Sequence, residues 1–403
     1  MNDENEINLS EKLIREKINA IYPKLVSIRR DIHKYPELGF EEKRTGEIIV
    51  EILEELDFKI YKGIAKTGII GQLKGKKTGP TIAFRADMDA LPIQEKNNIS
   101  YASKVPGKMH ACGHDGHVSI LLGAAKIFAK IKDKIPGQII LIFQPAEEGP
   151  GGAMPIIESG ILNNFNIEAI FGLHIFSTLP KGKISIKEGA ITSSVDNFVL
   201  NVKGKSSHGA HPETGIDAVL VACQIVNNLQ CIVSREISSN ESAVVTVGKI
   251  EGGYRRNVIA DNVSMEGTIR CTSPKTRKLV EAKFKRIIKG VTSAYGAEYE
   301  LNYKYGYPST INDKRMTDLV RKTSEEVVGE NNVIKLNNPE LVGEDVSYFL
   351  KKFPGCFFYL GGAIKGQKIV PHHSPYFNFE ESAMKLGVEM FVKIALNYFK
   401  NKY

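Results

Sequence analysis

The sequence has no tryptophan, no paired-cysteine motif and no long apolar run. Its five cysteines stand at positions 112, 223, 231, 271 and 356, an odd number without any CxxC spacing. Scattered cysteines of this kind indicate free thiols in a reducing compartment rather than a disulfide framework. No apolar stretch approaches the ~20 residues of a membrane-spanning helix. The polar, acidic start of the chain is not typical of a signal peptide. We therefore expect a cytoplasmic protein without a membrane segment.

The charge balance is basic but carries no nucleic-acid signature. The chain has 54 lysines and arginines against 46 aspartates and glutamates, for a net charge of +8. The lysines are dispersed among acidic residues, and no basic stripe alternates with aromatic side chains as a base-stacking platform would require. We expect no nucleic-acid partner and only a slightly faster approach of small anionic substrates.

The 403 residues suffice for two or three domains. Helical spacing of apolar residues over 10–32, with a break expected at Pro23, is followed by helical patterns over 45–56 and 118–131. Apolar strands over 139–143 and 169–173, together with 68–73 and 81–84 around a turn at 75–79, predict an α/β/α domain with a mostly parallel sheet. The turn at 75–79 is typical of a hairpin or a short crossover.

The pattern changes at about residue 190. Strand, helix, two strands, helix and strand follow over 197–202, 217–229, 243–247, 263–269, 275–291 and 297–303. This βαββαβ order is typical of a ferredoxin-like domain. A helix over 315–328, a strand over 356–360 and a helix over 380–399 then restore the first pattern. We expect a catalytic domain over 1–189 and 309–403, interrupted by an inserted lid or dimerisation domain over 190–308.

Four segments combine histidine, cysteine and glutamate at expected strand ends. They are residues 109–117 (MHACGHDGH), 143–149 (FQPAEEG), 171–174 (FGLH) and 371–375 (PHHSP). The carboxyl ends of parallel strands meet at one edge of a sheet, so these segments are expected to converge.

The residue types in these segments predict a transition-metal site. One thiol, several imidazoles and carboxylates suit zinc, manganese, cobalt or nickel, whereas magnesium prefers oxygen ligands. Ligands dispersed along the chain are typical of a catalytic rather than a structural site. Cys112 and His114 alone could be a buried thiol beside a surface histidine. Adjacent Glu147 and Glu148 point to opposite sides of an extended chain, so one can bind metal while the other faces a water molecule.

Several motifs resemble those of the di-metal amidohydrolases of the aminoacylase and glutamate carboxypeptidase superfamily. Within it, the chain is similar to the branch of hippurate hydrolase, auxin–amino acid conjugate hydrolase and N-acetyldiaminopimelate deacetylase. The resemblance covers nearly the whole chain. It rests on RDIH (30–33), PELG (36–39), RADMDALP (85–92), HACGHD (110–115), QPAEEG (144–149), SHGAHP (207–212), GED (343–345) and HSP (373–375).

The resemblance implies a role for particular residues at the metal site. Cys112 would bridge two metals, His114 and Glu148 would complete one site, and His174 and His373 would complete the other. Glu147 would be the general base, and Asp89 would orient a ligand. We expect His110, His117 and His372 to support the site or lie at the surface rather than bind metal.

The inserted domain would add substrate contacts. The resemblance implies that His208 polarises the scissile carbonyl, either within its own chain or from a partner subunit. Asn257 and Arg270 would contact the substrate carboxylate or the oxyanion, and backbone N–H groups at Gly361 could bind a carboxylate. Each of these could equally be a loop or surface residue. We expect a homodimer, or a larger homo-oligomer, formed through the inserted domain.

The implied activity is hydrolysis of the amide bond of N-acyl-L-amino acids to a carboxylic acid and a free amino acid. Glu147 would take a proton from water and return it to the departing amine. A di-metal exopeptidase or dipeptidase is the first alternative, although no anchor for a free α-amino group is recognisable. A non-catalytic metal-binding protein is the second, but it would be expected to lack Glu147 or a ligand.

Overall fold

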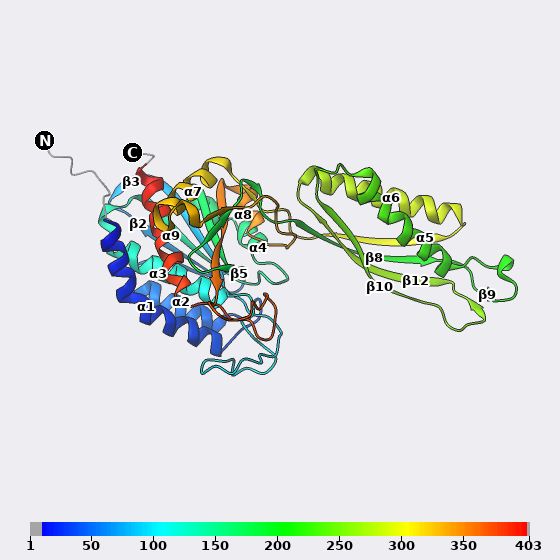
Figure 1. Cartoon of the computed structure of the whole chain (residues 1–403), viewed down its shortest axis with the longest axis horizontal. Helices are drawn as coiled ribbons and strands as arrows, with labels where there is room; N and C mark the ends of the chain where they lie inside the picture. Colours follow the sequence, from blue (N-terminus) through cyan, green and yellow to red (C-terminus); the bar gives the residue numbers. More distant parts are fainter. Residues whose placement is uncertain (1–9, 401–403) are drawn as a thin grey trace. The chain divides into compact units, whose positions relative to one another are not determined.

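The computed structural model describes residues 10–400, and compactness divides the chain into two units. The first comprises Met1–Gly189, Ile311–Asn337 and Tyr348–Tyr403, and the second comprises Ala190–Thr310 and Asn338–Ser347 (Figure 1). The segment 338–347 belongs to the second unit by its contacts, whereas the sequence analysis assigned it to the catalytic domain.

An eight-stranded sheet forms the centre of the first unit, in the order β1-β2-β4-β3-β5-β16-β6-β15. Its strands are β1 (Lys59–Ile64), β2 (Gly68–Lys74), β3 (Lys77–Asp87), β4 (Pro136–Gln144), β5 (Ile167–Pro180), β6 (Ile184–Ile186), β15 (Val333–Lys335) and β16 (Gly355–Ala363). The central strands β4, β3, β5 and β16 are parallel to their neighbours in this group. This confirms the predicted α/β class and the mostly parallel sheet.

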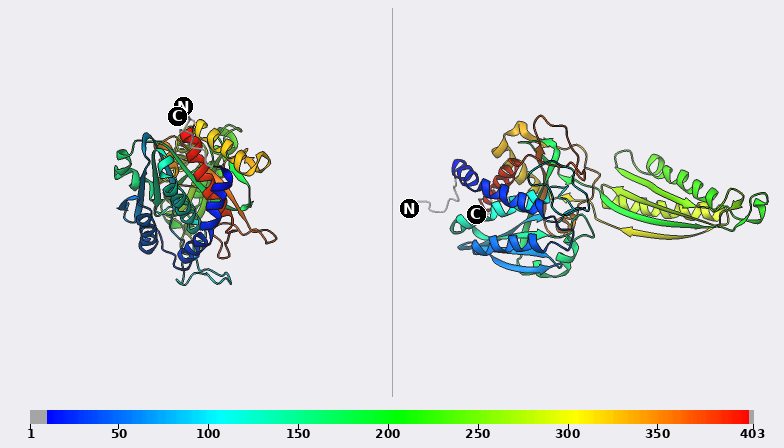
Figure 2. Two further views of the ribbon diagram at one scale, coloured as in Figure 1. Left: turned by 90° about the vertical axis from the view of Figure 1, so that its left-hand side faces the viewer. Right: turned by 90° about the horizontal axis from the view of Figure 1, so that it is seen from below.

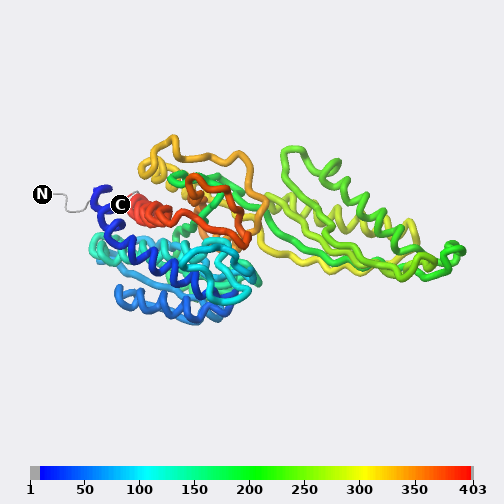
Figure 3. The backbone as a smooth tube through the Cα atoms, turned by 60° about the horizontal axis from the view of Figure 1, so that its bottom comes forward, coloured from blue at the N-terminus to red at the C-terminus, as the bar shows by residue number. Residues whose placement is uncertain are grey.

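The helices of this part of the chain lie beside the sheet (Figure 2). They are α1 (Glu11–Lys34), α2 (Lys43–Glu55), α3 (His114–Lys130), α4 (Ala153–Glu158), α7 (Lys314–Val328), α8 (Ser347–Lys352) and α9 (Ala383–Lys400), with short helices η1 (Lys132–Lys134), η2 (Ile161–Asn164) and η5 (Glu330–Asn332). The last long helix, α9, lies beside the first, α1, although they stand at opposite ends of the sequence (Figure 3). Both contribute to one core with α3.

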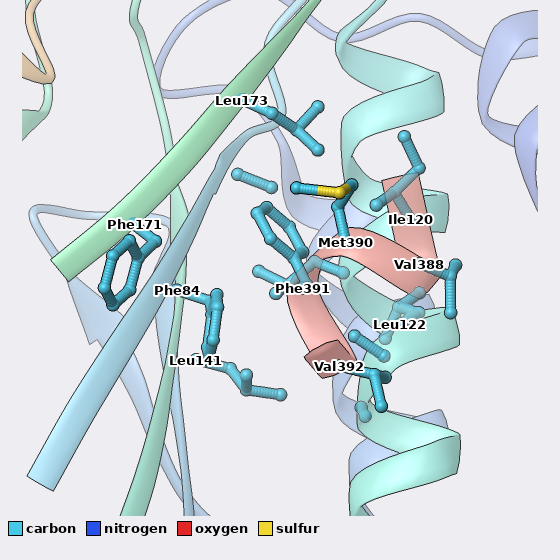
Figure 4. Packing of buried hydrophobic residues seen from close by; sticks show 14 of the residues in the cluster. Phe84, Ile120, Leu122, Leu141, Phe171, Leu173, Val388, Met390, Phe391 and Val392 are labelled. Atoms are coloured by element: carbon cyan, nitrogen blue, oxygen red, sulfur yellow. The ribbon is translucent and has the colours of Figure 1, made fainter. Parts of the chain in front are cut away.

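That core fills the space between α9, α3 and one face of the sheet (Figure 4). Phe391 of α9 packs on Phe84 of β3, with ring centroids 5.0 Å apart. Phe171 of β5 lies on the other side of Phe84, at 5.7 Å. Burial of aromatic and aliphatic side chains of this size contributes most of the stabilisation of such a layer. The packing therefore holds rigid the strands whose ends carry the functional residues.

Two expectations about local structure were wrong, and a third had left two alternatives open. Helix α1 continues through Pro23 without a break, because its apolar face is buried on both sides of the proline and outweighs one lost hydrogen bond. Of the two alternatives for the turn at 75–79, the structure has the crossover rather than the hairpin, since β4 lies between β2 and β3. His174 does not end its strand: β5 runs on to Pro180 because β16 pairs with it as far as Ala363.

The second unit contains β8 (Ser194–Lys203), α5 (Ala218–Cys231), β10 (Ala243–Gly252), β12 (Asn262–Cys271), α6 (Pro274–Ala294) and β13 (Glu298–Tyr305). Its antiparallel sheet has the order β10-β12-β8-β13. This order and the βαββαβ connection confirm the ferredoxin-like architecture. A small ribbon of β9 (Ser207–His208) and β11 (Val258–Ile259) extends beyond the sheet, with η3 (Pro212–Thr214) nearby in sequence.

Two of the four points where the chain passes between the units lie at or beside two-residue strands, β7 (Gly189–Ala190) and β14 (Ile311–Asn312), and the other two lie at the ends of 338–347. Within the second unit, α5 continues into η4 (Ile232–Glu236). The combined segment Ala218–Glu236 is long and apolar enough to cross a membrane by length and composition alone. Its buried side chains, among them Val221, Ile225 and Leu229, belong to the core of this unit. One third of the apolar window in this segment is buried.

Candidate metal centre

The candidate site lies in the first unit at the carboxyl ends of the parallel strands. Strand β3 ends at Asp87 and β4 ends at Gln144, so the segments that follow each strand lie at one edge of the sheet. Gly113 adopts a left-handed conformation (φ 94°), which starts α3 at His114 directly after Cys112. The four segments singled out in the sequence therefore meet at this edge.

One group of potential ligands consists of Cys112, His114 and His174, all buried. The Cys112 Sγ lies 3.3 Å from His174 Nε2, and the ligand atoms of all three lie within 4.8 Å of one another. His174 Nδ1 donates to the Ile175 carbonyl at 2.7 Å, which leaves its Nε2 lone pair facing the sulfur. The group has the soft donors that a divalent transition metal prefers.

The best evidence for a metal at this group is the orientation of His114. Its Nδ1 donates to the Asp89 carbonyl at 2.9 Å. Its Nε2 is buried and has no hydrogen-bond partner, and the Asp87 carboxylate lies 3.7 Å from it, beyond hydrogen-bond distance. A buried imidazole nitrogen without a partner costs free energy unless a ligand occupies its lone pair. A metal ion at this position fits the residues that surround it.

A second group shares the same sulfur. Cys112, Glu148 and His373 bring their ligand atoms within 4.8 Å of one another. His373 Nε2 lies 3.0 Å from Glu148 Oε1, and the His373 side chain is 52% exposed, so this side of the centre faces solvent. His373 is held in a left-handed conformation (φ 64°), with its N–H donating to the Ala111 carbonyl at 2.9 Å. The sulfur common to both groups is in the place of a bridging ligand.

The potential ligands combine in more than one way, and the pairing that the resemblance implied stays a prediction. His114 lies with His174 around the sulfur, and Glu148 lies with His373, whereas the sequence analysis paired His114 with Glu148 and His174 with His373. A third group, His114, Glu147 and Glu148, overlaps both. Glu147 is therefore adjacent to the potential ligands and is 6% exposed.

Two carboxylates hold the loop that presents Glu147 and Glu148. Asp89 accepts from both backbone N–H groups, with Oδ1 and Oδ2 each at 3.0 Å. Glu42 accepts from the Ala146 N–H at 2.9 Å, and Ala146 has a positive φ of 54°. Charged acceptors of this kind form strong hydrogen bonds and can hold a strained backbone. The loop is therefore held in place independently of any bound ligand.

Sequence reasoning assigned Asp89 a supporting role but missed Glu42. Glu42 and Ala146 are 104 residues apart, and nothing in the sequence distinguishes Glu42 from Glu41 beside it. Glu42 is buried, and burial raises its pKa to about 7. Only the folded chain reveals this residue.

His117 has both ring nitrogens engaged. Its Nδ1 donates to Asp87 Oδ1 at 2.6 Å, and its Nε2 accepts from the Ile175 N–H at 2.8 Å. Arg85 Nη1 donates to the other Asp87 oxygen at 2.7 Å. His117 thus connects α3, β3 and β5 beneath the ligands and has no lone pair for a metal.

A buried ion-pair network holds the first turn of α3. Asp115 accepts from Arg29 Nε at 2.7 Å and from His33 Nδ1 at 2.8 Å, and all three side chains are fully buried. Despite burial, the Arg29 charge keeps the pKa of Asp115 well below its usual range. His33 belongs to a segment singled out in the sequence, whereas Arg29 and its role were missed. Burial lowers the pKa of His110, beside this network, to about 4.

The protonation states at the candidate centre oppose metal binding. Burial lowers the pKa of His114, but the Asp87 and Asp89 carboxylates outweigh burial and raise it to about 10. Burial and the Glu148 and Glu147 carboxylates raise the pKa of the Cys112 thiol well above its usual value. Without a metal, these two groups therefore carry protons that a metal ion would have to displace.

The residues predicted to bind substrate lie in both units. His208, on β9, accepts from the Ala210 N–H through Nδ1 at 3.1 Å, so a neutral ring carries its proton on Nε2. The Asn257 carbonyl accepts from the Gly209 N–H next to it, at 2.9 Å. Arg270, near the far end of β12, has a buried Nη1 without a hydrogen-bond partner. In the first unit, the Gly361 N–H donates to the Lys183 carbonyl at 2.9 Å and is not free to bind a substrate.

Comparison with known proteins identifies the family. Residues 83–397 match the peptidase family M20/M25/M40. The chain belongs to this family. It is 38% identical over 378 residues to the N-acetylcysteine deacetylase of Bacillus subtilis, covering 94% of this chain and 97% of the relative. It is also 38% identical over 403 residues to thermostable carboxypeptidase 1 of Saccharolobus solfataricus, covering 98% of this chain and 100% of the relative.

A solved structure shares the fold of the chain. The Bacillus subtilis protein YXEP, described as a dinuclear metal-binding peptidase of the M20 family, is 35% identical with a TM-score of 0.82, covering 95% of this chain and 99% of that one. Membership of the M20 family, together with the clustered ligands, makes the chain a metal-dependent amidohydrolase.

Proposed function

We propose that this M20 hydrolase cleaves the amide bond of N-acyl-L-amino acids. The observation that carries the proposal is the pair of ligand groups that share Cys112 beside Glu147. We assign His114 and His174 to one metal ion, Glu148 and His373 to the other, and Cys112 to both. Zinc, manganese, cobalt and nickel suit a thiolate with imidazoles, and magnesium does not.

The residues of the chain divide the work of hydrolysis. Two divalent metal ions, when bound, would supply Lewis acidity for the substrate carbonyl and for a water molecule. Glu147 takes the proton of the attacking water and delivers it to the nitrogen of the departing amino acid. Asp89 holds the Glu147 and Glu148 backbone, so the base stays aligned through both proton transfers.

We propose that His208 donates its Nε2–H to the oxygen of the scissile carbonyl, where negative charge develops. Arg270, with an unpartnered buried Nη1, is suited to a substrate carboxylate, and Asn257 lies beside the His208 segment. His208 follows the ten-residue strand β8 of the second unit. We propose that it acts on a substrate bound by a partner subunit.

A dimer through the second unit is part of this proposal. β10 is an edge strand, and its Ile250 side chain is 52% exposed. Val219 and Leu220 of α5 are also exposed, by 42% and 46%. Apolar side chains on an edge strand and an adjacent helix are suited to burial against a second copy. We further propose a cytoplasmic location, which the five free cysteines support.

An exopeptidase is the second candidate function, favoured by the similarity to the carboxypeptidase of Saccharolobus solfataricus. A release assay with metal-loaded protein separates the two. N-acetyl, N-benzoyl and long-chain acyl amino acids are compared with unblocked dipeptides of the same amino acid. We expect release from the acylated substrates. Faster release from unblocked dipeptides would favour the exopeptidase, and no release from either class would reject both.

A further inference from the structure

His372 lies next to the candidate metal centre, in the same unit, but belongs to neither ligand group. Its Nδ1 lies 3.7 Å from Cys112 Sγ. Its Nε2 lies 3.3 Å from the backbone nitrogen of Ser177. The ring therefore lies between the sulfur that both ligand groups share and the backbone of β5.

The contact with Ser177 determines where the proton of the ring is. A backbone N–H can only donate, so His372 Nε2 must accept and cannot carry a proton. A neutral imidazole then has its single proton on Nδ1. That nitrogen faces Cys112, with both the sulfur and the backbone carbonyl of the residue as possible acceptors.

Aromatic neighbours fix the plane of the ring. The centroid of His372 lies 4.9 Å from that of Phe377, 5.1 Å from that of Phe176 and 5.1 Å from that of His174. These contacts prevent the ring from turning away from Cys112. The direction of the Nδ1–H bond is thus set by packing as well as by the Ser177 contact.

We propose that His372 is a positioning residue that donates its Nδ1–H to the Cys112 thiolate and sets the orientation and donor strength of the bridging sulfur. This inference rests on the proposed function in that Cys112 must be a metal ligand. A hydrogen bond to a metal-bound thiolate fixes the direction of its remaining lone pairs and lowers the electron density that the sulfur gives to the metal. Of the two acceptors that Nδ1 faces, the charged sulfur benefits most from a donor.

Two conservative substitutions of His372 test the roles of its two ring nitrogens separately. In His372→Asn, the amide nitrogen takes the place of Nδ1, so the donor to sulfur is kept and the acceptor for Ser177 is lost. In His372→Gln, the longer side chain reaches the place of Nε2, so the acceptor is kept and the donor is lost. His372→Phe removes both and retains a ring. Phe377→Leu is the control for disturbed packing around His372.

The test uses cobalt-loaded protein and its sulfur-to-cobalt charge-transfer absorption. Loss of a hydrogen bond raises the energy of the sulfur lone pairs, so the band should move to longer wavelength in His372→Gln and His372→Phe. Metal affinity should fall about ten- to a hundredfold in both, as for other residues that support metal ligands. His372→Asn and Phe377→Leu should keep a band and an affinity near those of the wild type. An unshifted band in His372→Gln, or equal losses in His372→Asn and His372→Phe, would overturn the proposal.

A measurement on the wild type removes any dependence on how the variants fold. Two-dimensional ¹⁵N–¹H spectra of the metal-loaded protein distinguish the two imidazole tautomers, and we expect Nδ1–H for His372. The Nε2–H tautomer would contradict the proposal. Cys112→Ser separates this outcome from failure of the proposed function. If the wild type has no charge-transfer band that Cys112→Ser removes, Cys112 is not a metal ligand and the proposed centre itself is wrong.

Discussion

At the scale of single residues, the ring nitrogens that already have partners decide which nitrogens can bind metal. His174 uses Nδ1 for a backbone carbonyl and keeps Nε2 available, and His114 does the same. His117 has both nitrogens engaged. Of these three histidines, only the first two therefore have a ring nitrogen available for a metal. Hydrogen bonding gives a physical reason for the division of roles that the resemblance implied.

The role of Glu147 is tested by Glu147→Gln, which removes the base and keeps the shape of the side chain. We expect metal content and fold to be unchanged and kcat to fall by at least ~10²-fold, because proton transfer is lost. The matched variant Glu148→Gln should instead lose bound metal. Retention of more than about a tenth of the wild-type rate in metal-loaded Glu147→Gln would reject the role.

Metal binding should release protons. The pKa of His114 is raised to about 10 and that of the Cys112 thiol lies well above its usual value, so both are protonated near pH 7.5 in the metal-free protein. A metal ion binds only the deprotonated forms, so roughly two protons should be released per chain. Calorimetric titrations in buffers of different ionisation enthalpy measure this number. Cys112→Ser should lower it by about one, and a value near zero in the wild type would contradict these protonation states.

At the scale of elements, the 146–148 loop shows what the sequence could and could not predict. The apolar run of β4 followed by Glu147 and Glu148 indicated a strand end with functional carboxylates, because that pattern is local. The acceptors Asp89 and Glu42 contact the loop from distant parts of the chain, so no local pattern predicts their geometry. Pro23 within α1 illustrates the same limit, since tertiary packing outweighs a local signal there.

Glu42 makes the free energy of unfolding of the protein depend on pH. Burial raises its pKa from 4.5 to about 7 in the folded chain. Between these values the unfolded chain loses the proton first, so the contribution of Glu42 to stability is complete below pH 4.5 and is lost as the pH rises through about 7. The loss in the free energy of unfolding is about 3 kcal/mol.

Glu42→Gln should remove this loss, because the amide cannot ionise but still accepts from the Ala146 N–H. Denaturant unfolding of the metal-free protein at pH 5 and pH 8 measures the effect. The variant should gain stability relative to the wild type on going from pH 5 to pH 8. Glu41→Gln, at the exposed neighbouring position, is the control and should show no such gain. An equal response in the two variants would show that burial of Glu42 is not the cause.

At the scale of the whole molecule, the proposed ligands lie in the first unit, and His208 and Arg270 lie in the second. The sequence predicted both architectures because the change from buried parallel strands to a βαββαβ pattern is periodic and extends over many residues. It could not predict which loops come together, since that depends on packing between distant elements.

Mixing two inactive variants tests whether His208 serves a partner subunit. His208→Ala and Glu147→Ala chains are each expected to be inactive alone. If His208 acts on the partner, half of the dimers in an equal mixture have one intact site, and about a quarter of wild-type activity should return. No recovery, with subunit exchange verified by labelled chains, would place His208 in its own chain or outside the chemistry.

The account depends most on one sulfur shared by two metal ions. Anomalous diffraction from crystals of the metal-loaded protein measures this directly, at the absorption edge of the metal. We predict two ions that both contact Cys112 Sγ, one also bound by His114 and His174 and the other by Glu148 and His373. A single ion, or two ions of which only one contacts Cys112, would contradict the account.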